Sequence, residues 1–489
     1  MAWERIETIR ERLSSERGRL EKRVGAAVVL AYPSPYSAGM SSLGFQQVYR
    51  LIQGLDGIRC ERSFLPDEKN ATPITYEGER PLDEFPVIAF SVAYELELSG
   101  LVLMLENSNI PSLREDRTAA HPFILAGGPL TFSNPLPLAA FADAIVMGEA
   151  EALVEPVVRR LLEGGDREKL LDDLAAMPHV FVPARHGAAM PITARTDDDA
   201  LPARSVIITP HTELADMFLI EAERGCSRAC TYCVMRRSTN GGMRIVPKER
   251  LLELIPTDAR RVGLVGAAVS DHPRITQIVT ELADRGAEVG LSSLRPDRLS
   301  DEFVGALARA GYRTLTTAMD GLSERLRESL ERRARVKHLE RAAELARAHK
   351  MKRLKLYLMV GLPGETDDDV DECVSFIGGL SSRVPIALGV APFCAKRNTP
   401  LDGAPYAGIE VVQARLERLR RGLRGRADVR ATSARWAWVE YVLAQGGVSE
   451  GRALREATLA GGAFSDYKRA FEAARSTSPG RRSLVIASV

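Results

Sequence analysis

Three of the six cysteines fall within a stretch of eight residues. Cys226, Cys230 and Cys233 have the spacing CxxxCxxC in the segment RGCSRACTYC. On a loop between a strand and a helix this spacing lets three thiolates converge, and soft thiolates favour zinc or iron–sulfur sites. Structural zinc usually takes four protein ligands, and the nearest histidines, His211 and His272, form no obvious pair with the triplet. A [4Fe-4S] cluster held by three cysteines would leave one iron open to an exogenous ligand.

The other three cysteines, Cys60, Cys373 and Cys394, are scattered along the chain. Cysteines this sparse do not build a disulfide framework, and an isolated free cysteine is usually a small buried hydrophobic residue. Cys394 follows an expected strand, so its thiol has two interpretations. It either packs in the core, or it donates hydrogen to a radical or ligates metal.

The composition is that of an ordinary globular protein. The 489 residues suffice for two or three domains, and 66 basic against 65 acidic side chains leave a net charge of +1. This near-neutral total does not indicate nucleic-acid binding by the chain as a whole. No apolar run reaches the ~20 residues that span a bilayer, and the charged N-terminus lacks the apolar core of a secretion signal. We therefore expect a cytoplasmic protein without a membrane span.

Residues 25–164 are expected to form a doubly wound, Rossmann-like parallel sheet, because short apolar runs alternate with stretches of helical spacing. The expected strands are 26–31, 87–91, 123–126 and 144–147, and the expected helices are 94–108, 151–162 and one that begins near Leu43. Loops at the carboxyl ends of such strands form a ligand crevice. A helix over 1–24 precedes this domain, and a proline-containing connecting segment, 165–215, follows it.

A second alternating region covers residues 216–408. Its expected strands are 218–221, 261–265, 288–292, 314–318, 354–360 and 386–392. Six such units suit a partial (β/α)6 barrel of TIM type, whose functional groups lie at the carboxyl ends of the strands. The cysteine triplet directly follows the first of these strands. The remaining residues, 409–489, are expected to form a basic, helical C-terminal region.

With Gly225 before its first cysteine and Tyr232 before its last, the triplet resembles the signature of the radical S-adenosylmethionine (radical SAM) superfamily. The resemblance implies an α/β enzyme in which Cys226, Cys230 and Cys233 are the catalytic residues that hold the cluster, with Tyr232 beside the cofactor. It also implies that S-adenosylmethionine (SAM) binds the open iron and is cleaved to a 5′-deoxyadenosyl radical. The electron would come from a donor of flavodoxin or ferredoxin type.

Later strand ends also resemble cofactor-binding segments of the superfamily. The segment LKLYLMVGLPGET resembles the one that passes the adenine of SAM, which implies contacts from Gly361 and Pro363. Glu365, in the same segment, is expected to cap the following helix. Asp320 stands where related enzymes carry Glu. It is either a partner of the cofactor's ribose or amine, or a helix N-cap.

The cofactor's carboxylate and amino groups also need partners. The segment LSSLRPD resembles its counterpart in relatives, which implies Ser293 and Arg295 near the carboxylate, with Arg244 as a second candidate. The strand VGLVGAAVSDHP lacks the Gly-Gly-Glu that often holds the amino group. The expected substitutes are backbone carbonyls near Gly266 and Ala267, or the side chains of Ser270 and Asp271.

The first domain resembles the cobalamin-binding-type domain that precedes the radical barrel in one branch, and nearly the whole chain is similar to an uncharacterised family of that branch. Segments such as YPSPYSAGMSSLGFQ and ADAIVMGEAE carry the likeness. It implies cobalamin as a further cofactor, with Gly127 and Gly128 allowing the corrin to approach the backbone. However, the loop 33–40 lacks the histidine that ligates cobalt in classical cobalamin domains. The alternative is a degenerate domain that binds nothing, or that recognises a partner.

The leading hypothesis is a cobalamin-dependent methyltransferase acting on an unactivated carbon; radical rearrangement and cyclisation are alternatives with the same domain pair. Methylthio transfer to RNA or protein would need three further N-terminal cysteines, and only Cys60 precedes the triplet. The other class is a non-catalytic iron–sulfur or zinc protein whose tail binds RNA. Its basic stretch would be Arg415, Arg418, Arg420, Arg421, Arg424 and Arg426, with Trp436 and Trp438 beyond. A solvated helix explains this stretch equally simply, and we favour it.

Overall fold

The chain divides into two compact units. The structure, a computed structural model, describes residues 2–235, 242–292 and 294–477. The first unit, called here the N-terminal unit, comprises Met1–Asp216 together with Val442–Val489. The second, called the barrel unit, comprises Met217–Tyr441. Each unit is described by itself.

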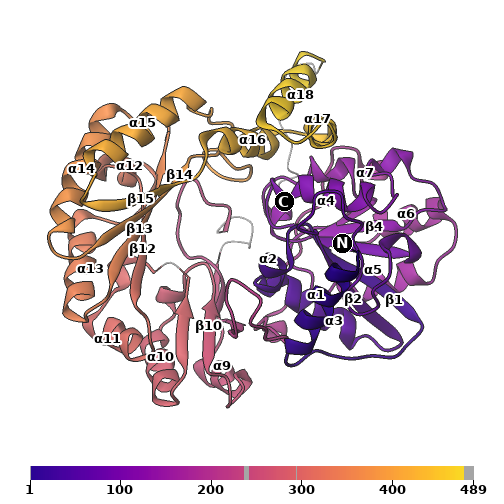
Figure 1. Ribbon diagram of the computed structural model, residues 1–489, viewed down its shortest axis with the longest axis horizontal. Helices are drawn as coiled ribbons and strands as arrows, with labels where there is room; N and C mark the ends of the chain where they lie inside the picture. Colours follow the sequence, from indigo (N-terminus) through magenta and orange to yellow (C-terminus); the bar gives the residue numbers. More distant parts are fainter. Residues whose placement is uncertain (1, 236–241, 293, 478–489) are drawn as a thin grey trace. The chain divides into compact units, whose positions relative to one another are not determined.

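The N-terminal unit is built on one sheet whose strand order is β2-β1-β3-β4-β5-β6 (Figure 1). Its strands are β1 (Ala26–Tyr32), β2 (Ile58–Phe64), β3 (Val87–Ser91), β4 (Phe123–Gly127), β5 (Ala144–Val146) and β6 (Val180–Phe181). All pairings are parallel except that of β5 with β6. The strand order reverses between β1 and β3, which is the switch point where doubly wound sheets bind ligands.

Helices cover both faces of this sheet, as the doubly wound prediction requires. Helices α3 (Leu43–Gly54) and α5 (Val154–Leu162) contact each other on one face. Right-handed crossovers place α4 (Glu97–Glu106) on the opposite face. There α4 contacts α17 (Val448–Leu459), which comes from the far end of the chain.

Strand β2 was not predicted, because its sequence IRCERSF is not an apolar run. Its charged residues are nevertheless buried: Arg62 is 0% and Glu61 is 2% exposed. Ion pairs make the charged residues of this strand compatible with the interior. Hydrophobic periodicity alone cannot detect such a strand.

The first helix is shorter than expected. Helix α1 covers Ala2–Ser15, not 1–24. Gly18 then has a φ of +84°, and a Cβ there would lie 2.1 Å from the carbonyl oxygen of Val206. Next to it, Arg17 and Ile208 exchange two backbone hydrogen bonds of 2.9 and 3.0 Å. The chain leaves the helix because it pairs with the segment near Val206.

The segment 165–215 is more than a connection. It contains α6 (Arg167–Ala175), β6 and α7 (Pro183–His186). Asp166 caps α6 by accepting a hydrogen bond from the backbone N–H of Lys169. Because β6 pairs with β5, this segment completes the edge of the N-terminal sheet.

The parallel strands that the structure describes in the barrel unit are the six expected ones and a seventh. These are β7 (Phe218–Glu221), β10 (Arg261–Val265), β11 (Glu288–Leu291), β12 (Thr314–Asp320), β13 (Arg353–Val360), β14 (Ile386–Pro392) and β15 (Ala427–Ala431). They form the parallel sheets β11-β10-β7 and β12-β13-β14-β15, joined by an isolated parallel bridge between Leu294 and Thr317. The result is a partial barrel, open between β7 and β15 among the described residues.

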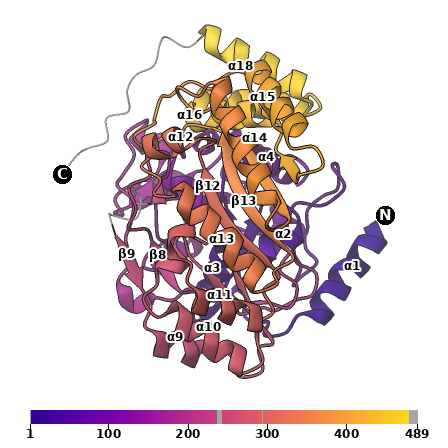
Figure 2. The same ribbon diagram turned by 90° about the vertical axis from the view of Figure 1, so that its left-hand side faces the viewer.

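Helices follow the barrel strands and cover their outer side, as α11, α13 and α14 do in Figure 2. The helices concerned are α9 (Lys248–Leu254), α10 (Ile275–Asp284), α11 (Asp301–Arg309), α12 (Glu324–Ser329), α13 (Val336–Ala348), α14 (Asp367–Ser381) and α15 (Ile409–Gly422). With the outside covered, the loops that follow the strand carboxyl ends are the part of the barrel available for chemistry.

The C-terminal region differs from the expected single helical region 409–489. Helix α15 and strand β15 belong to the barrel unit, and α16 (Ala434–Gln445) spans the boundary between the units. Helices α17 and α18 (Phe464–Thr477) return to the N-terminal unit. There the side-chain amide of Asn134, which is fully buried, donates to the carbonyls of Leu443, Ala444 and Gly446 at 2.9–3.1 Å.

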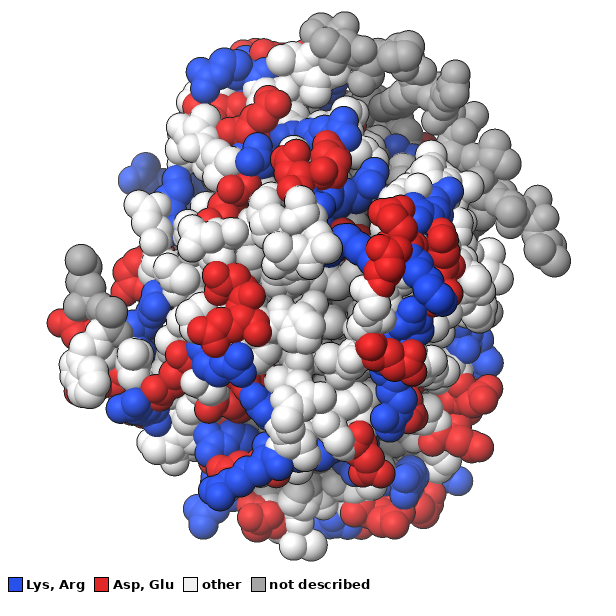
Figure 3. All heavy atoms as spheres, turned by 90° about the vertical axis from the view of Figure 1, so that its right-hand side faces the viewer, with Lys and Arg blue, Asp and Glu red and all other residues white. Residues whose placement is uncertain are grey.

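The charged surface agrees with the near-neutral composition. On the face shown in Figure 3, basic and acidic side chains are interspersed rather than gathered by sign. Within the described ranges, no helix is both long and apolar enough to cross a membrane.

Candidate active site

The three clustered cysteines lie on one loop at the carboxyl end of the first barrel strand. The loop, called here the cysteine loop, covers residues 226–233 and follows the short strand β8 (Glu223–Gly225), which pairs with β9 (Met243–Ile245). Gly225 has a φ of +85°, a conformation that few residues other than glycine adopt readily. Cys226, Cys230 and Cys233 are free thiols and partly exposed.

Neighbouring strand ends hold the cysteine loop in place. The backbone N–H of Thr231 donates to the carbonyl of Leu330 at 3.1 Å, and its carbonyl accepts from Leu401 at 3.2 Å. Leu330 follows β12 and Leu401 follows β14. The loop is therefore braced by segments from two other strand ends of the barrel.

Charged side chains at and after the end of β12 also brace the cysteine loop. Arg332 Nε lies 2.5 Å from Asp320 Oδ2. Burial lowers the pKa of Arg332, but the negative charge of Asp320 outweighs that effect and raises it. Asp320 also accepts a hydrogen bond from Tyr232, and burial raises the Asp320 pKa despite these partners. The carboxylate of Asp320 thus contacts both Arg332 and Tyr232, and so links Arg332 to the cysteine loop.

Asp320 does not act as the helix N-cap that was one of its two interpretations. The N-cap of α12 is Ser323, whose side chain accepts from the N–H of Leu326. Asp320 instead ends β12 with a φ of +65°, at an irregularity in the pairing with β13. This strained conformation turns the residue out of the regular strand at the mouth of the barrel.

Glu223 is a buried carboxylate that lies three residues before Cys226. It is 0% exposed, and its Oε1 accepts from the N–H of Ala268 at 2.6 Å. Its Oε2 is buried without a hydrogen-bond partner in the described structure. A Cβ on Gly266 would lie 2.2 Å from Oε1, so the carboxylate occupies the space that this glycine leaves. Burial, together with the charges of Glu221 and Asp271, raises the Glu223 pKa to about 7.

Arg295 pairs with two carboxylates. Its Nη1 lies 2.9 Å from Asp271 and its Nη2 lies 2.5 Å from Asp297. Its backbone N–H donates to Ser270 Oγ at 3.0 Å. Ser270 and Asp271, the expected substitutes for the missing Gly-Gly-Glu, are therefore both engaged with Arg295.

The other arginine proposed for the cofactor's carboxylate, Arg244, is 8% exposed on β9, directly opposite Arg224 of β8. It is therefore part of the hairpin that leads into the cysteine loop. Ser293 lies outside the described residues.

The Gly-Leu-Pro-Gly-Glu turn follows β13, but Glu365 does not cap the next helix. Its carboxylate accepts from the N–H groups of Gly361 at 2.9 Å and Leu362 at 3.2 Å, and it pairs with Arg415 at 3.0 Å. The N-cap of α14 is Thr366. Gly361 has a φ of +84°, and Glu365 holds this turn closed from within while Pro363 is exposed.

Cys394 follows β14 and is half-buried. Its thiol donates to the carbonyl of Ala437 on α16 at 3.1 Å. This contact favours the packing interpretation of the residue.

Comparison with known proteins identifies the chain. The family model for radical SAM proteins, N-terminal, matches residues 44–183, and that of the radical SAM superfamily matches residues 220–377. The second match begins in β7 and includes all three clustered cysteines. The chain belongs to the radical SAM superfamily. This superfamily consists of enzymes whose cofactors are a [4Fe-4S] cluster and SAM.

The radical SAM chain has two kinds of relatives. It is 26% identical to the uncharacterized protein MJ0966 of Methanocaldococcus jannaschii over 388 residues, which cover 77% of this chain and 79% of that one. It is 24% identical to the ribosomal protein uS12 methylthiotransferase RimO of Desulfosudis oleivorans, over 40% of this chain and 45% of that one. It thus spans less than half of the methylthiotransferase.

Among solved structures, the apo form of the cobalamin-dependent radical SAM enzyme OxsB shares the fold. The TM-score is 0.52 at 13% identity, over 81% of this chain and 56% of that one. The likeness covers both the parallel-sheet domain and the barrel, as expected from the sequence. At this identity it establishes the fold alone.

The residues of the radical SAM barrel fit the cluster by their chemistry. Burial raises the pKa of both Cys226 and Cys233, and the charge of Cys230 contributes in each case, so the three thiols share one electrostatic neighbourhood. Within the described ranges, no three His, Cys, Asp or Glu side chains already converge as a metal site. Three thiols on one loop, without a fourth protein ligand beside them in the sequence, match a cluster with one open iron.

The N-terminal unit has the doubly wound fold expected of a cobalamin domain, but the loops that follow its parallel strands offer no imidazole for cobalt. The loops after β1, β3, β4 and β5 contain no histidine. In the β1 loop, Tyr36 is 1% exposed and its hydroxyl donates to Glu16 at 2.7 Å. A Cβ on Gly128 would lie 2.6 Å from the Val92 carbonyl oxygen, and a Cβ on Gly127 would meet Val146 at 3.5 Å. The backbone of the unit itself therefore explains the glycine at 128.

Two of the six arginines in the basic tail stretch pair with carboxylates of the barrel unit. Arg415 pairs with Glu365, and Arg418 lies 2.5 Å from Asp371 and 3.2 Å from Asp367. These pairs tie α15 to the start of α14, which is the behaviour of a surface helix that packs on its own unit. They support the solvated-helix interpretation over RNA binding.

Sequence reasoning missed Glu223 and Arg332. Glu223 lies inside the segment IEAERGC, but nothing in the segment tells which of its two glutamates turns inward. Arg332 is one of many arginines between residues 325 and 335. The only available signal was proximity to the cysteine triplet in the first case, and to Asp320 in the second.

Proposed function

We propose that Cys226, Cys230 and Cys233 hold a [4Fe-4S] cluster whose open iron binds SAM, and that the chain uses this centre to abstract hydrogen from a carbon of its substrate. When bound, the cluster supplies the electron that cleaves SAM. The observation that carries the proposal is the position of three free thiols on one braced loop, at the carboxyl end of the first strand of a radical SAM barrel.

We assign Glu223 to the amino group of SAM. An ammonium group needs acceptors in a site without water, and Glu223 Oε2 is a buried acceptor without a partner among the described residues. Its position three residues before Cys226 and beside Gly266 supports this role. Gly361 and Pro363 offer the turn for the adenine, while Asp320 and Arg332 position the cysteine loop rather than the cofactor.

The finer proposal is methyl transfer from cobalamin to that carbon. The pairing of a doubly wound domain with the barrel supports it. A cobalamin bound by the N-terminal unit would be held without an imidazole from the loops at its switch point, because those loops contain no histidine.

Methylthio transfer, the activity in the names of several relatives, has less support. Cys60 is the only cysteine before the triplet, and it is 1% exposed on β2. A single buried thiol cannot ligate a second cluster of the kind that would need three cysteines.

The test is anaerobic reconstitution of the full chain with iron and sulfide, followed by an assay for 5′-deoxyadenosine with dithionite or a flavodoxin as reductant. We expect iron–sulfur absorbance and 5′-deoxyadenosine from the wild type, and loss of both in Cys230→Ala. Cys394→Ser, a change to a half-buried thiol outside the loop, is the matched control and retains both. Cluster absorbance that survives in Cys230→Ala overturns the ligand assignment.

Cobalamin is tested separately in the same preparations. If the N-terminal unit binds it, adding hydroxocobalamin shifts its optical spectrum and the pigment co-elutes with the chain on gel filtration. An unchanged spectrum with free pigment rejects the finer proposal and leaves the cluster assignment untouched.

A further inference from the structure

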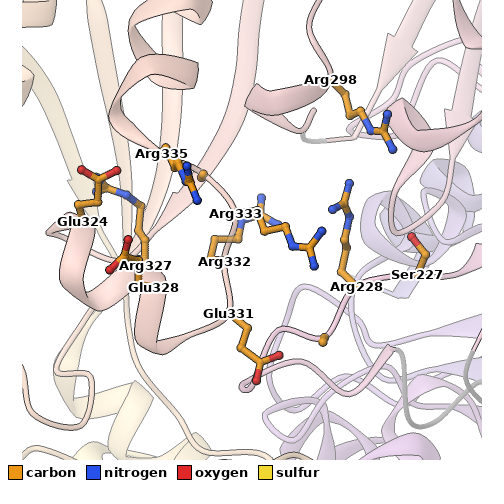
Figure 4. A pocket seen from close by; sticks show the side chains of 12 residues that line it. Ser227, Arg228, Arg298, Glu324, Arg327, Glu328, Glu331, Arg332, Arg333 and Arg335 are labelled. Atoms are coloured by element: carbon orange, nitrogen blue, oxygen red, sulfur yellow. The ribbon is translucent and has the colours of Figure 1, made fainter.

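An arginine-rich pocket lies directly beside the cysteine loop. It is a cavity of about 690 Å³, a size typical of sites for small-molecule ligands. Its walls come from the cysteine loop, from the segment that follows β11, and from α12 with the loop after it, on the face of the barrel where the strands end (Figure 4). Its arginines are Arg228, Arg298, Arg327, Arg332, Arg333 and Arg335, and its acidic residues are Glu324, Glu328 and Glu331.

Three guanidinium groups from three different loops face the same opening. Figure 4 shows the side chains of Arg228, Arg298 and Arg333 turned toward it, while the carboxylates of Glu324 and Glu328 lie at the other end. Like charges that converge in this way repel one another. An anion between them would remove that repulsion.

Acidic side chains compensate only part of this charge. Arg228 and Arg298 contact Asp271 at 3.3 and 3.2 Å, but the same carboxylate also pairs with Arg295. With Asp297, two carboxylates serve three arginines. One positive charge of this group therefore remains.

A further observation marks the pocket as a binding site. Arg333 is exposed, and its guanidinium has no acidic partner within the described ranges. Arg327 also lines the pocket, but it is 1% exposed and donates to the carbonyl of Gly321 at 3.3 Å. It lies beside Glu324 and Glu328 in Figure 4, so it is not among the arginines that face the opening.

We propose that this pocket binds a phosphate or pyrophosphate group of the substrate. The inference rests on the proposed function, because it places that group next to the loop that would hold the cluster. Arginine forks match phosphate oxygens in a bidentate manner, and a phosphate carries more negative charge than a single carboxylate. The glutamates at the far end of the cavity disfavour an extended polyphosphate backbone, so the structure favours a small phosphorylated molecule over a nucleic acid.

The experiment is titration calorimetry of the reconstituted full chain with inorganic pyrophosphate at constant ionic strength. We expect one site per chain, weakened about tenfold by Arg333→Gln and less by Arg333→Lys, which keeps the charge but not the fork. The matched control is Arg341→Gln. Arg341 is an exposed arginine on α13, 3.5 Å from Glu344, and its replacement leaves the affinity unchanged.

Three outcomes overturn the proposal: no binding of pyrophosphate, equal weakening by Arg333→Gln and Arg341→Gln, or equally tight binding of malonate. Tighter, Arg333-dependent binding of a single-stranded RNA oligomer would instead assign the pocket to nucleic acid. The 5′-deoxyadenosine assay on the wild-type preparation distinguishes a failure of the pocket proposal from a failure of the proposed function. SAM cleavage without pyrophosphate binding rejects the pocket alone, and binding without cleavage rejects the proposed function alone.

Discussion

Each unit of the molecule buries charged side chains, and the two units differ in how completely these charges are paired. In the N-terminal unit, Arg62 is fully buried and pairs with Glu77 at 2.6 Å and with both oxygens of Glu16 at 2.8 Å. In the barrel unit, Glu223 is equally buried, but one of its oxygens has no partner among the described residues. The charges of the Arg62 cluster (Arg62, Glu16 and Glu77) are all paired, whereas Glu223 has an acceptor oxygen without a partner in the described part of the chain.

The difference separates charges that serve the fold from charges that serve binding. A buried charge is tolerated only when hydrogen bonds and opposite charges replace its lost hydration. The Arg62 cluster meets this condition from within the protein. Glu223 does not, and it lies three residues before the first cysteine of the loop where a cofactor is expected.

Breaking the Arg62 cluster should have the largest effect on stability. Arg62→Met leaves Glu16 and Glu77 without their cation, and we expect the free energy of unfolding to fall by about 3–5 kcal/mol. Arg10→Met, which removes an exposed pair with Glu79, should cost no more than about 1 kcal/mol. Urea unfolding measures both. Similar losses in the two variants would contradict the distinction.

The buried carboxyl group of Glu223 should make the stability of the chain depend on pH. The folded-state pKa of Glu223 is about 7 against an ordinary 4.5, so the folded chain binds the proton more tightly than the unfolded chain does. The stability of the cofactor-free chain should therefore fall as pH rises from about 4.5 to above 7, by about 1–3 kcal/mol for this group. Melting temperatures across this range should flatten in Glu223→Gln but not in Glu249→Gln, an exposed control on α9. An unchanged slope in Glu223→Gln would show that other groups cause the dependence.

Two adjacent glycines at the end of β4 test whether the N-terminal unit needs a glycine there for its own backbone or for a ligand. Gly128→Ala places a methyl group against the Val92 backbone at a φ of +110°, and should cost about 2 kcal/mol. Gly127→Ala meets only an ordinary contact at 3.5 Å and should change stability by less than about 0.5 kcal/mol. Thermal unfolding compares them. Equal stability with loss of cobalamin binding in Gly128→Ala would instead support the ligand role expected from the sequence.

The smallest expected effect concerns the cofactor. Glu223→Gln retains an acceptor oxygen but loses the charge, so SAM should bind about tenfold more weakly to the reconstituted chain, with cluster absorbance intact. Equilibrium dialysis with labelled SAM measures the affinity. Wild-type affinity in the variant would remove Glu223 from the cofactor site.

The sequence predicted the strands that are apolar runs and missed those that are not. β7, β10 and β14 match their expected bounds, because their residues are apolar and bracketed by turn residues. β2 and β15 carry charged residues that only the three-dimensional structure accommodates. The same limit applies to the site. The cysteine triplet is visible because its spacing is local, whereas Arg332 meets Cys230 from a strand end about a hundred residues away.

The return of α17 to α4 has a consequence for how the chain can be built and cut. The barrel is an insertion, with its two ends attached to the same partner unit. The layer over α4 is incomplete until the last helices have left the ribosome, so the N-terminal unit, although synthesised first, can finish folding only last. A fragment that stops at Asp216 would expose the apolar side of α4, and Asn134 would lose the three carbonyls it holds. Expression of the first half alone should therefore yield an aggregating protein, while deletion of the insert is the better route to the isolated unit.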